Sequence, residues 1–597
     1  MTVPLLARRD IDFFLFDWLK AHDLPCRNRY VEHSHENFSA FLDLCEDVAA
    51  RYFAPHNKKG DAEEPQFDGE SVTVIPEVKQ ALDAFVGADL LGITMDYEVG
   101  GSQLPRTVAD AGLAWFAAAN VSTYAYLMLT AANANLLMAH GSAEQIESFV
   151  KPMLKGEHLG TMCLSETEAG SSLADITTRA EPAQGGCYRL FGSKMWISGG
   201  DHELSNNIVH LVLAKISGGP AGAKGISLFV VPKFVVAADG TYQRNDVTLV
   251  GLNHKMGYRG TTNTVLAFGD GAHNPGGAAG AIGYLVGEPH YGLKYMFHMM
   301  NEARLAVGMG AVALGYTGYL KSVAYAKERR QGRAAKSAGV SAAPVAIIEH
   351  ADVKRMLLAQ KSYVEGAMAL ALFCSRLVDI AQSPLSPDEG VSAELMLDVL
   401  TPVAKSWPSQ WCLEANHLAI QVHGGYGYSR EYDVEQHYRD NRLNAIHEGT
   451  YGIQSLDLLG RKVGQLDGAG LAVLDSAVRN TIAEAAAHGG EVGVHATALT
   501  AAWTDLLSVT EVLLVHDDLE VSLANSAIYM EAFGHIVVAW IWLQLLCVVG
   551  ARDGEFFDGK RQAGSFFFRY ELPKTGAQLA LLRSKDRTTV DMRPTWF

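Results

Sequence analysis

The spacing of apolar side chains divides the chain into helical and strand-like stretches. Apolar positions recur about every three to four residues in residues 1–160 and again from residue 287 onward, which is the period of an α-helix. Residues 161–286 carry short runs rich in β-branched and aromatic side chains, separated by glycine-rich turns, and these runs predict strands. The polar stretch from Pro55 to Asp68 predicts a loop. We therefore expect an α+β multidomain fold.

The changes in this pattern predict four domains. Residues 1–160 form an N-terminal helical domain and residues 161–286 a middle β-domain. Residues 287–463 form a second helical domain, and residues 464–597 an additional, mostly helical C-terminal domain. A chain of 597 residues is too long for one hydrophobic core, since such cores rarely grow beyond about 250–300 residues.

One segment, residues 532–551, is apolar enough to raise the question of a membrane. Its length is close to the roughly 20 residues that span a bilayer. However, His535 and Gln544 interrupt it, and Arg552 is the one basic residue close by. We favour a buried helix of a large α-domain, and a peripheral membrane contact stays an open alternative.

Charge and cysteine usage narrow the classes of partner. The net charge of −17 argues against nucleic acid or an anionic membrane as the main partner. The 7 cysteines are scattered and form no Cys-x-x-Cys pair, so neither a disulfide framework nor a zinc site is indicated. No apolar signal segment opens the sequence. We expect a cytoplasmic protein without a metal.

The candidate chemistry centres on Glu448, which precedes Gly449 at the start of an apolar helix. Free backbone N–H groups at a helix N-terminus can polarise a bound carbonyl group, and glycine allows a ligand to approach the backbone. This arrangement suits abstraction of a proton next to a carbonyl. Glutamate in a first helical turn is also a common capping or dipole residue, so Glu448 alone does not decide the function.

Four motifs in order change that balance. They are Met162–Ser171, Gly192–Ser198, Gln421–Tyr428 and Glu448–Thr450. Together they resemble the acyl-CoA dehydrogenase family, in particular a bacterial branch with an additional C-terminal domain that includes methylmercaptopropionyl-CoA dehydrogenases and fatty acyl-CoA dehydrogenases. The resemblance implies a middle β-barrel-like domain and a four-helix bundle between the outer helical domains.

The resemblance implies FAD as the cofactor, bound between the β-domain and the helical bundles of two subunits. No Gly-x-Gly-x-x-Gly follows a strand, and Gly308 and Gly310 lie in a helical run, where they permit close helix packing. The implied FAD contacts are Met162, Leu164, Ser165, Trp196, Ile197 and Ser198 around the flavin ring; Arg329, Gln331, Gln421, Gly424 and Gly425 at the diphosphate of the neighbouring subunit's FAD; and Thr450 and Gly452. Without the resemblance, Trp196 is better interpreted as a core residue of the β-domain.

The resemblance also makes Glu448 the catalytic base. Some relatives carry the base just before an arginine on another helix, but here Ala303 precedes Arg304, and the adjacent Glu302 would point about 100° away on a helix. The implied substrate contacts are Ser171, Arg304 and Gly449. His447 replaces a tyrosine that is common before the base, and it either alters the pH profile or packs.

The function that follows is FAD-dependent α,β-dehydrogenation of a saturated acyl-CoA to trans-2-enoyl-CoA, as in fatty acid β-oxidation. We expect a medium- to long-chain substrate, electron-transfer flavoprotein as acceptor and a homodimer or larger assembly. The alternatives are a methylmercaptopropionyl-CoA dehydrogenase and an acyl-CoA oxidase that uses O₂. A DNA-associated relative is disfavoured because residues 464–597 contain 16 acidic and 10 basic residues.

Overall fold

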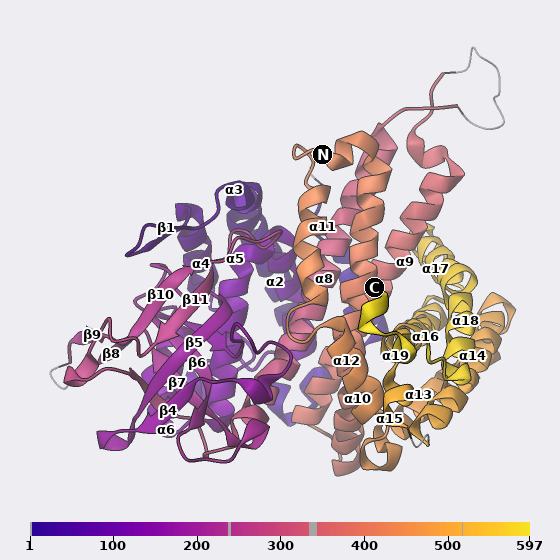
Figure 1. Cartoon of the computed structure of the whole chain (residues 1–597). Helices are drawn as coiled ribbons and strands as arrows, with labels where there is room; N and C mark the ends of the chain where they lie inside the picture. Colours follow the sequence, from indigo (N-terminus) through magenta and orange to yellow (C-terminus); the bar gives the residue numbers. More distant parts are fainter. Residues whose placement is uncertain (1–2, 237–239, 334–342, 516–517) are drawn as a thin grey trace. The chain divides into compact units, whose positions relative to one another are not determined.

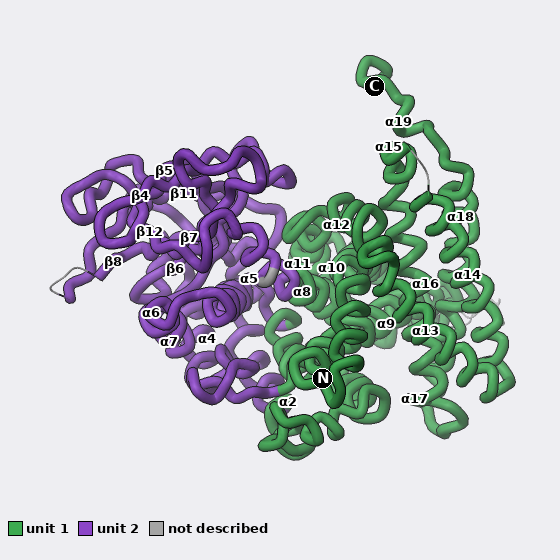
Figure 2. Tube along the Cα trace, turned by 90° about the horizontal axis from the view of Figure 1, so that it is seen from below, with its two compact units in different colours: residues 1–42, 105–118, 304–597 green, residues 43–104, 119–303 purple. Residues whose placement is uncertain are grey.

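The chain folds as two compact units, coloured separately in Figure 2. The computed structural model describes residues 3–236, 240–333, 343–515 and 518–597. Unit 1 comprises residues 1–42, 105–118 and 304–597, and unit 2 comprises residues 43–104 and 119–303. Three helices have residues in both units: α2 (His35–Val48), α5 (Arg106–His140) and α8 (Gly292–Glu328).

Unit 2 is built on strands that hydrogen-bond into a closed ring. Most of these strands are labelled in Figure 1. The ring runs β5–β12–β7–β6–β4 and returns to β5, while β3 extends it beside β6, and β11 and β10 extend it beside β5. The bounds are β3 (His158–Cys163), β4 (Arg179–Pro182), β5 (Tyr188–Ser198), β6 (Asn207–Ile216), β7 (Ile226–Pro232), β10 (Val247–Leu252), β11 (Asn263–Phe268) and β12 (Ala281–Leu285). The predicted β-barrel-like domain is thereby confirmed.

The central strands are apolar on both faces because each face packs on something different. On β6, Val209 and Leu211 pack in a core shared with Leu136 of α5, whereas the alternate Val212 packs in a second core with Leu190 of β5. Successive side chains of a strand point to opposite faces, so one strand contributes to both cores. This explains why the sequence there reads as a continuous apolar run.

The remaining elements of unit 2 are short. They are α3 (Asn57–Ala62), α4 (Pro76–Gly87), α6 (Ala143–Gln145) and α7 (Lys151–Leu154), with the strand pairs β1 (Gln66–Phe67) with β2 (Val72–Thr73) and β8 (Phe234–Val236) with β9 (Tyr242–Arg244). The prediction of a loop at 55–68 was therefore wrong. Helix α3 buries Gly60 and Asp61, and tertiary packing here overrides a polar local sequence.

Unit 1 is a bundle of long helices followed by the C-terminal extension. Its helices are α1 (Arg8–Asp12), α9 (Ala351–Gln382), α10 (Pro387–His423), α11 (Val434–Arg442), α12 (Tyr451–Asp457), α13 (Gln465–His488), α14 (Gly490–Leu514), α15 (Leu519–Leu523), α16 (Ser526–Val549), α17 (Glu555–Phe566), α18 (Thr575–Ser584) and α19 (Thr588–Asp591). Helices α9 and α10 pack side by side over much of their length (Figure 1).

Glycine allows α8 to approach α10 closely. A Cβ atom built on Gly308 would lie 2.1 Å from the carbonyl oxygen of Ala404, and one on Gly315 would lie 2.7 Å from Cβ of Cys412. No larger residue fits at the first position without moving a backbone. The expected packing role of Gly308 is therefore what the structure shows, and it places the middle of α8 beside the middle of α10.

The apolar C-terminal segment is the buried helix α16. Within the described residues it is the one helix long and apolar enough to cross a membrane, and 83% of its most apolar window is buried. It packs on the bundle: Trp542 Nε1 donates to the carbonyl of Ser362 on α9 at 3.1 Å, and Gly534 contacts Trp407 on α10. The helix thus has protein neighbours that account for its composition.

Candidate active site

The predicted base lies on a left-handed turn that leads into α12. Glu448 has φ +53° and Gly449 φ +90°, and Thr450 caps the helix by accepting a hydrogen bond from the Ile453 N–H at 3.3 Å. A left-handed non-glycine residue costs roughly 1–2 kcal/mol and persists only where its surroundings hold it. The turn therefore needs partners.

Two side chains hold the carbonyl groups of this turn. Gln454 Nε2 donates to the carbonyl of Glu448 at 2.9 Å, and Lys405 Nζ donates to the carbonyl of Gly449 at 2.7 Å. A Cβ atom on Gly449 would lie 2.5 Å from Gln454 Nε2, so the first contact requires glycine at 449. Consecutive peptide groups around the carboxylate are thus fixed from α12 and from α10.

A chain of buried amides holds the segment before the base. His447 Nε2 lies 3.0 Å from Asn444 Oδ1, Asn444 donates to Asn441 at 3.0 Å, and Asn441 donates to Asn416 at 2.7 Å. Because the Asn444 amide nitrogen is used toward Asn441, its oxygen accepts from His447. Burial lowers the pKa of His447 to about 3, so it stays neutral at physiological pH. Of the two expectations for His447, the structure supports packing.

The electrostatics suit a base that works near neutral pH. Burial raises the pKa of Glu448 from its ordinary 4.5 to about 7, although Arg304 and Lys405 oppose that rise. Burial likewise lowers the pKa of Lys405 to about 7, opposed by Glu448. Arg304 is 4% exposed and contacts Asp457 at 3.4 Å. A carboxylate of this kind can remove a weakly acidic proton.

The neighbouring carboxylate is engaged elsewhere. Glu302 accepts a hydrogen bond from Asn135 Nδ2 at 3.1 Å within unit 2, and Ala303 is buried. Glu448 thus stays the candidate base. Arg304 was expected at CoA; the structure buries it with Asp457, where it acts on Glu448, and its contact with CoA stays a prediction.

A pocket of about 1190 Å³ in unit 1 gathers the predicted diphosphate residues. Arg329, Gln331, Gly424 and Gly425 line it, and the Arg329 guanidinium lies over the Tyr426 ring at 5.5 Å. The two glycines have no atom within 4 Å of a Cβ position, so a ligand can meet their backbone. An arginine fork beside open glycine backbone suits a diphosphate. Glu448 does not line this pocket.

The other predicted cofactor positions in unit 1 are placed less tightly. Gln421 is exposed near the end of α10, where its carbonyl accepts from Gly424 N–H, and it does not line the pocket. Thr450 caps α12, and Gly452 faces open space. Their roles toward a cofactor stay predictions.

In unit 2, Trp196 is presented at the surface instead of in the core. It is 55% exposed and has φ +64°, so an aromatic residue occupies the left-handed region. The core interpretation of Trp196 was therefore wrong. An exposed aromatic ring on strained backbone indicates a binding surface. Ile197, in contrast, is 2% exposed and packs in the barrel core, so it offers only backbone atoms to a ligand.

The segment Met162–Ser165 is tied to the strand that carries Trp196. Met195 N–H donates to the Ser165 carbonyl at 3.0 Å, and Asn263 donates to Ser198 Oγ at 3.2 Å. Met162, Leu164, Ser165 and Ser198 are half-buried. The structure thus brings the predicted flavin-ring residues of unit 2 onto adjoining chain segments, while Ser171 lies exposed further along.

A buried ion pair fixes this surface. Lys194 Nζ donates to the Leu164 carbonyl and to Glu166 Oε1, both at 2.9 Å. Burial alone would raise the pKa of Glu166, but Lys194 and hydrogen bonds from Thr178 and Thr177 lower it to about 2. Glu166 is thus ionised at physiological pH, and both members of the pair belong to the sequence motifs.

Sequence reasoning missed four residues that hold the site: Lys405, Gln454, Lys194 and Glu166. One signal was available for the first. A lysine within the apolar run Val403–Trp407 of a buried helix must find a partner, because an unpaired buried charge is costly. The identity of that partner, 44 positions along the chain, could not be read from periodicity.

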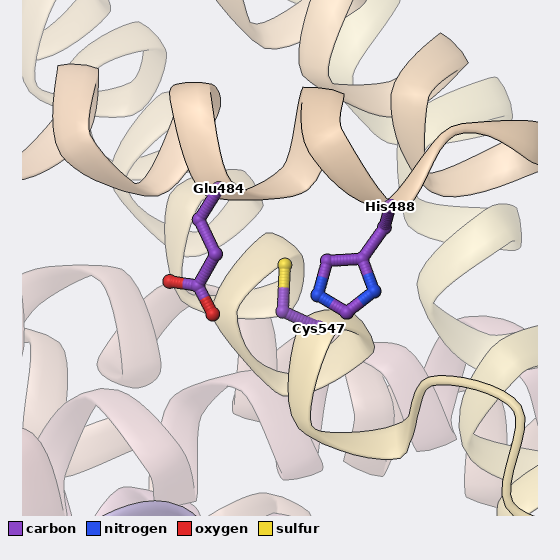
Figure 3. Close-up of side chains that lie close together, drawn as sticks. All are labelled: Glu484, His488 and Cys547. Atoms are coloured by element: carbon purple, nitrogen blue, oxygen red, sulfur yellow. The ribbon is translucent and has the colours of Figure 1, made fainter.

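One group of side chains in the described residues could hold a metal ion (Figure 3). Glu484 and His488 of α13 and Cys547 of α16 place one ligand atom each within 4.8 Å of one another. Burial and the nearby Glu484 carboxylate raise the pKa of Cys547 to about 11, so the thiol is protonated at neutral pH. None of the three belongs to the predicted catalytic or cofactor residues.

Comparison with known families agrees with this geometry. Four family models match: acyl-CoA dehydrogenase N-terminal domain (residues 35–157), middle domain (161–270) and C-terminal domain (290–463), and acetyl-CoA dehydrogenase C-terminal like (475–593). The match over the last model covers the C-terminal extension that resemblance had placed beyond the common core.

Individual relatives cover most of the chain. A 3-methylmercaptopropionyl-CoA dehydrogenase of Ruegeria pomeroyi is 36% identical over 76% of this chain and 75% of its own length. The broad-specificity linear acyl-CoA dehydrogenase FadE5 of Mycobacterium tuberculosis is 31% identical over 94% of both chains. Caenorhabditis elegans ACDH-11, solved in complex with C11-CoA, superposes with a TM-score of 0.76 at 17% identity, covering 100% of this chain and 94% of its own, which shows the shared fold.

Proposed function

Because the chain belongs to the acyl-CoA dehydrogenase family and is an FAD-dependent oxidoreductase acting on CH–CH bonds, we propose that it converts linear saturated acyl-CoA to trans-2-enoyl-CoA with Glu448 as base. The observation that carries the assignment of the base is its environment. Glu448 has a pKa near 7 on a turn whose flanking carbonyls are both held by side chains. The two nearby carboxylates are engaged elsewhere: Asp457 pairs with Arg304 and Arg461, and Glu302 accepts a hydrogen bond from Asn135.

The chain's own residues supply proton removal and positioning. Glu448 removes the proton α to the thioester carbonyl, which requires a basic carboxylate and a polarised carbonyl. Arg304 and Lys405, both buried nearby, stabilise the carboxylate form so that it exists at neutral pH. When bound, FAD accepts the β-hydrogen as hydride at its flavin ring.

The residues present fit FAD. The exposed Trp196 with Met162, Leu164 and Ser165 would hold the flavin ring, and the pocket with Arg329, Gly424 and Gly425 would hold a diphosphate. Glu448 does not line this diphosphate pocket. The separation supports the proposal that the pocket serves the FAD of a second subunit, and hence that the protein is a homodimer. Arg329→Ala should then lower FAD retention more than acyl-CoA binding to the holo-enzyme, and a holo monomer in solution would contradict the dimer.

Linear medium- to long-chain acyl-CoA is the proposed substrate class. It is supported by the relative that spans 94% of the chain, whose name specifies broad-specificity linear substrates. A short thioether substrate, 3-methylmercaptopropionyl-CoA, is the second candidate, because the relative named for it has the higher identity of the two. Comparing kcat/KM for straight-chain thioesters from C4 to C18 and for 3-methylmercaptopropionyl-CoA decides between the two.

Electron-transfer flavoprotein is the proposed acceptor. Substrate-reduced enzyme, prepared anaerobically, should be reoxidised far faster by an electron-transfer flavoprotein than by O₂. Rapid formation of H₂O₂ in air, at the rate of substrate turnover, would instead establish an acyl-CoA oxidase.

A further inference from the structure

We propose that Lys405 is a positioning residue which, together with Gln454, holds the Glu448–Gly449 turn in the left-handed conformation that aims the base. The inference deepens the proposed function and rests on it for the identity of the base. It makes no use of the cofactor. The buried Lys405 ammonium group and the Gln454 amide each bind one of two successive backbone carbonyls, and through them they position the carboxylate side chain.

Lys405 is buried beside the Glu448–Gly449 turn. The residue lies mid-way along α10 and is 0% exposed, and its Nζ lies 2.7 Å from the Gly449 oxygen. A fully buried ammonium group is strongly destabilising unless it is hydrogen-bonded, so this contact is not incidental. The Lys405 carbonyl in turn accepts a hydrogen bond from Ser409 Oγ at 2.6 Å.

Helix α10 approaches α8 closely at Ala404, the residue before Lys405. Pro408 has no N–H, so it leaves the carbonyl of Ala404, four residues earlier, without its helical donor. That carbonyl faces Gly308, where any Cβ would lie only 2.1 Å away. Lys405 directly follows Ala404, and Arg304 lies one turn before Gly308. Both side chains are close enough to Glu448 to lower the pKa of its carboxyl group.

Two side-chain contacts hold the Glu448–Gly449 turn. Gly449 at φ +90° and Glu448 at φ +53° each direct a carbonyl toward one donor, Lys405 and Gln454 respectively. Loss of either donor removes the side-chain partner of that carbonyl, which destabilises this turn and favours a different one. Displacement of the base should slow catalysis strongly, since misplacement by about 1 Å can reduce the rate about 10²-fold.

Lys405 and Gln454 differ in charge, and Lys405 also acts electrostatically on Glu448. The charged groups that act on Glu448 are Arg304 from α8 and Lys405 from α10, with Asp457 of α12 paired to Arg304. His447, adjacent on the turn, stays neutral. Removing the positive charge at 405 should therefore raise the pKa of Glu448, whereas changing Gln454 should disturb geometry alone.

Three variants at Lys405 separate the two effects in the holo-enzyme. Lys405→Met removes donor and charge, Lys405→Gln keeps a donor without charge, and Lys405→Arg keeps both. We expect Lys405→Met to lower kcat about 10²-fold with a smaller change in KM. Lys405→Gln should recover at least about tenfold of that loss, with its acidic limb in kcat still displaced to higher pH. Lys405→Arg should keep the limb of the native enzyme.

The matched control is Lys361→Met. Lys361 is also a mostly buried lysine, and its partner Glu365 keeps Lys560 at 3.0 Å when Lys361 is lost. Its kcat and pH profile should match the native protein. Gln454→Leu should lower kcat as Lys405→Met does but leave the pH limb in place.

Two results would overturn the proposal. One is a Lys405→Met enzyme with kcat within about twofold of native and an unmoved pH limb. The other is an equal loss of FAD content and activity in the Met, Gln and Arg variants, which would make Lys405 a folding residue. Glu448→Gln is measured in parallel: an active Glu448→Gln enzyme contradicts the base itself, whereas an inactive one beside an active Lys405→Met contradicts only the positioning role.

Discussion

Lys194 and Glu166 form a buried ion pair at 2.9 Å that joins two of the family motifs in unit 2. Lys194 is 0% exposed and Glu166 8%, and the lysine also holds the Leu164 carbonyl. Lys194, two residues before Trp196, therefore acts on the backbone of the segment that is predicted to contact the flavin ring.

Lys194→Met should destabilise unit 2 and reduce FAD content. It leaves Glu166 as a buried charge without its lysine, which costs about 3–5 kcal/mol. Thermal denaturation and the flavin-to-protein absorbance ratio measure the two effects. The control is Arg51→Ala, whose partner Asp47 is exposed, and whose loss should cost less than about 1 kcal/mol. Native flavin content in Lys194→Met would contradict the role of the pair.

Gly308→Ala should destabilise the bundle and lower activity together. The added methyl meets the Ala404 carbonyl at 2.1 Å, so α8 and α10 must separate, at a cost of about 1–3 kcal/mol. The separation also moves Lys405 away from Gly449. Gly576→Ala in α18 is the control, because its Cβ would face open space and alanine is the better helix former. Equal melting temperatures for the two variants would refute the packing argument.

The pH dependence follows from the raised pKa of Glu448. The rate, measured as kcat/KM, should rise with pH through about 7 as the carboxylate loses its proton. The effect on stability has the opposite sign. The folded protein binds this proton more tightly than the unfolded chain, so the contribution of Glu448 to stability is lost as pH rises from 4.5 through about 7.

Glu448→Gln does not titrate, so its melting temperature relative to native protein should increase between pH 5 and pH 8. Melting curves of both proteins across that range test this directly. A constant difference would show that the pKa of Glu448 is the same in the folded and unfolded chain.

The sequence predicted the fold well wherever one period dominates. Helical periodicity was expected from residue 287 onward, where α8 spans Gly292–Glu328, and the closed strand ring lies within 161–286 as expected. It failed at Pro55–Asp68, where α3 forms from a polar sequence because Gly60 and Asp61 pack inward. Local composition there carries no trace of the tertiary contacts that decide the structure.

The sequence predicted part of the site, because some of its residues stand in recognisable motifs. Glu448 and Gly425 stand in motifs that the resemblance identifies, and Arg329 is implied by the same resemblance. The structure places Arg329 and Gly425 in the lining of one pocket, and burial raises the pKa of Glu448 to about 7. Those motifs do not reveal the side-chain contacts that hold the turn of the base. Lys405 meets Gly449 from a helix that packs closely on Gly308, and a relationship among three distant residues has no periodic signal.

The most direct test of the account is the turnover of Glu448→Gln with a straight-chain acyl-CoA, measured as anaerobic bleaching of the flavin. Glu302→Gln serves as the control, because its amide can still accept from Asn135 and it is not the base. We predict that Glu448→Gln keeps FAD and binds acyl-CoA but reduces the flavin at least about 10³-fold more slowly, while Glu302→Gln stays near native. Flavin reduction by Glu448→Gln within tenfold of the native rate would contradict the account, since it would place the base elsewhere.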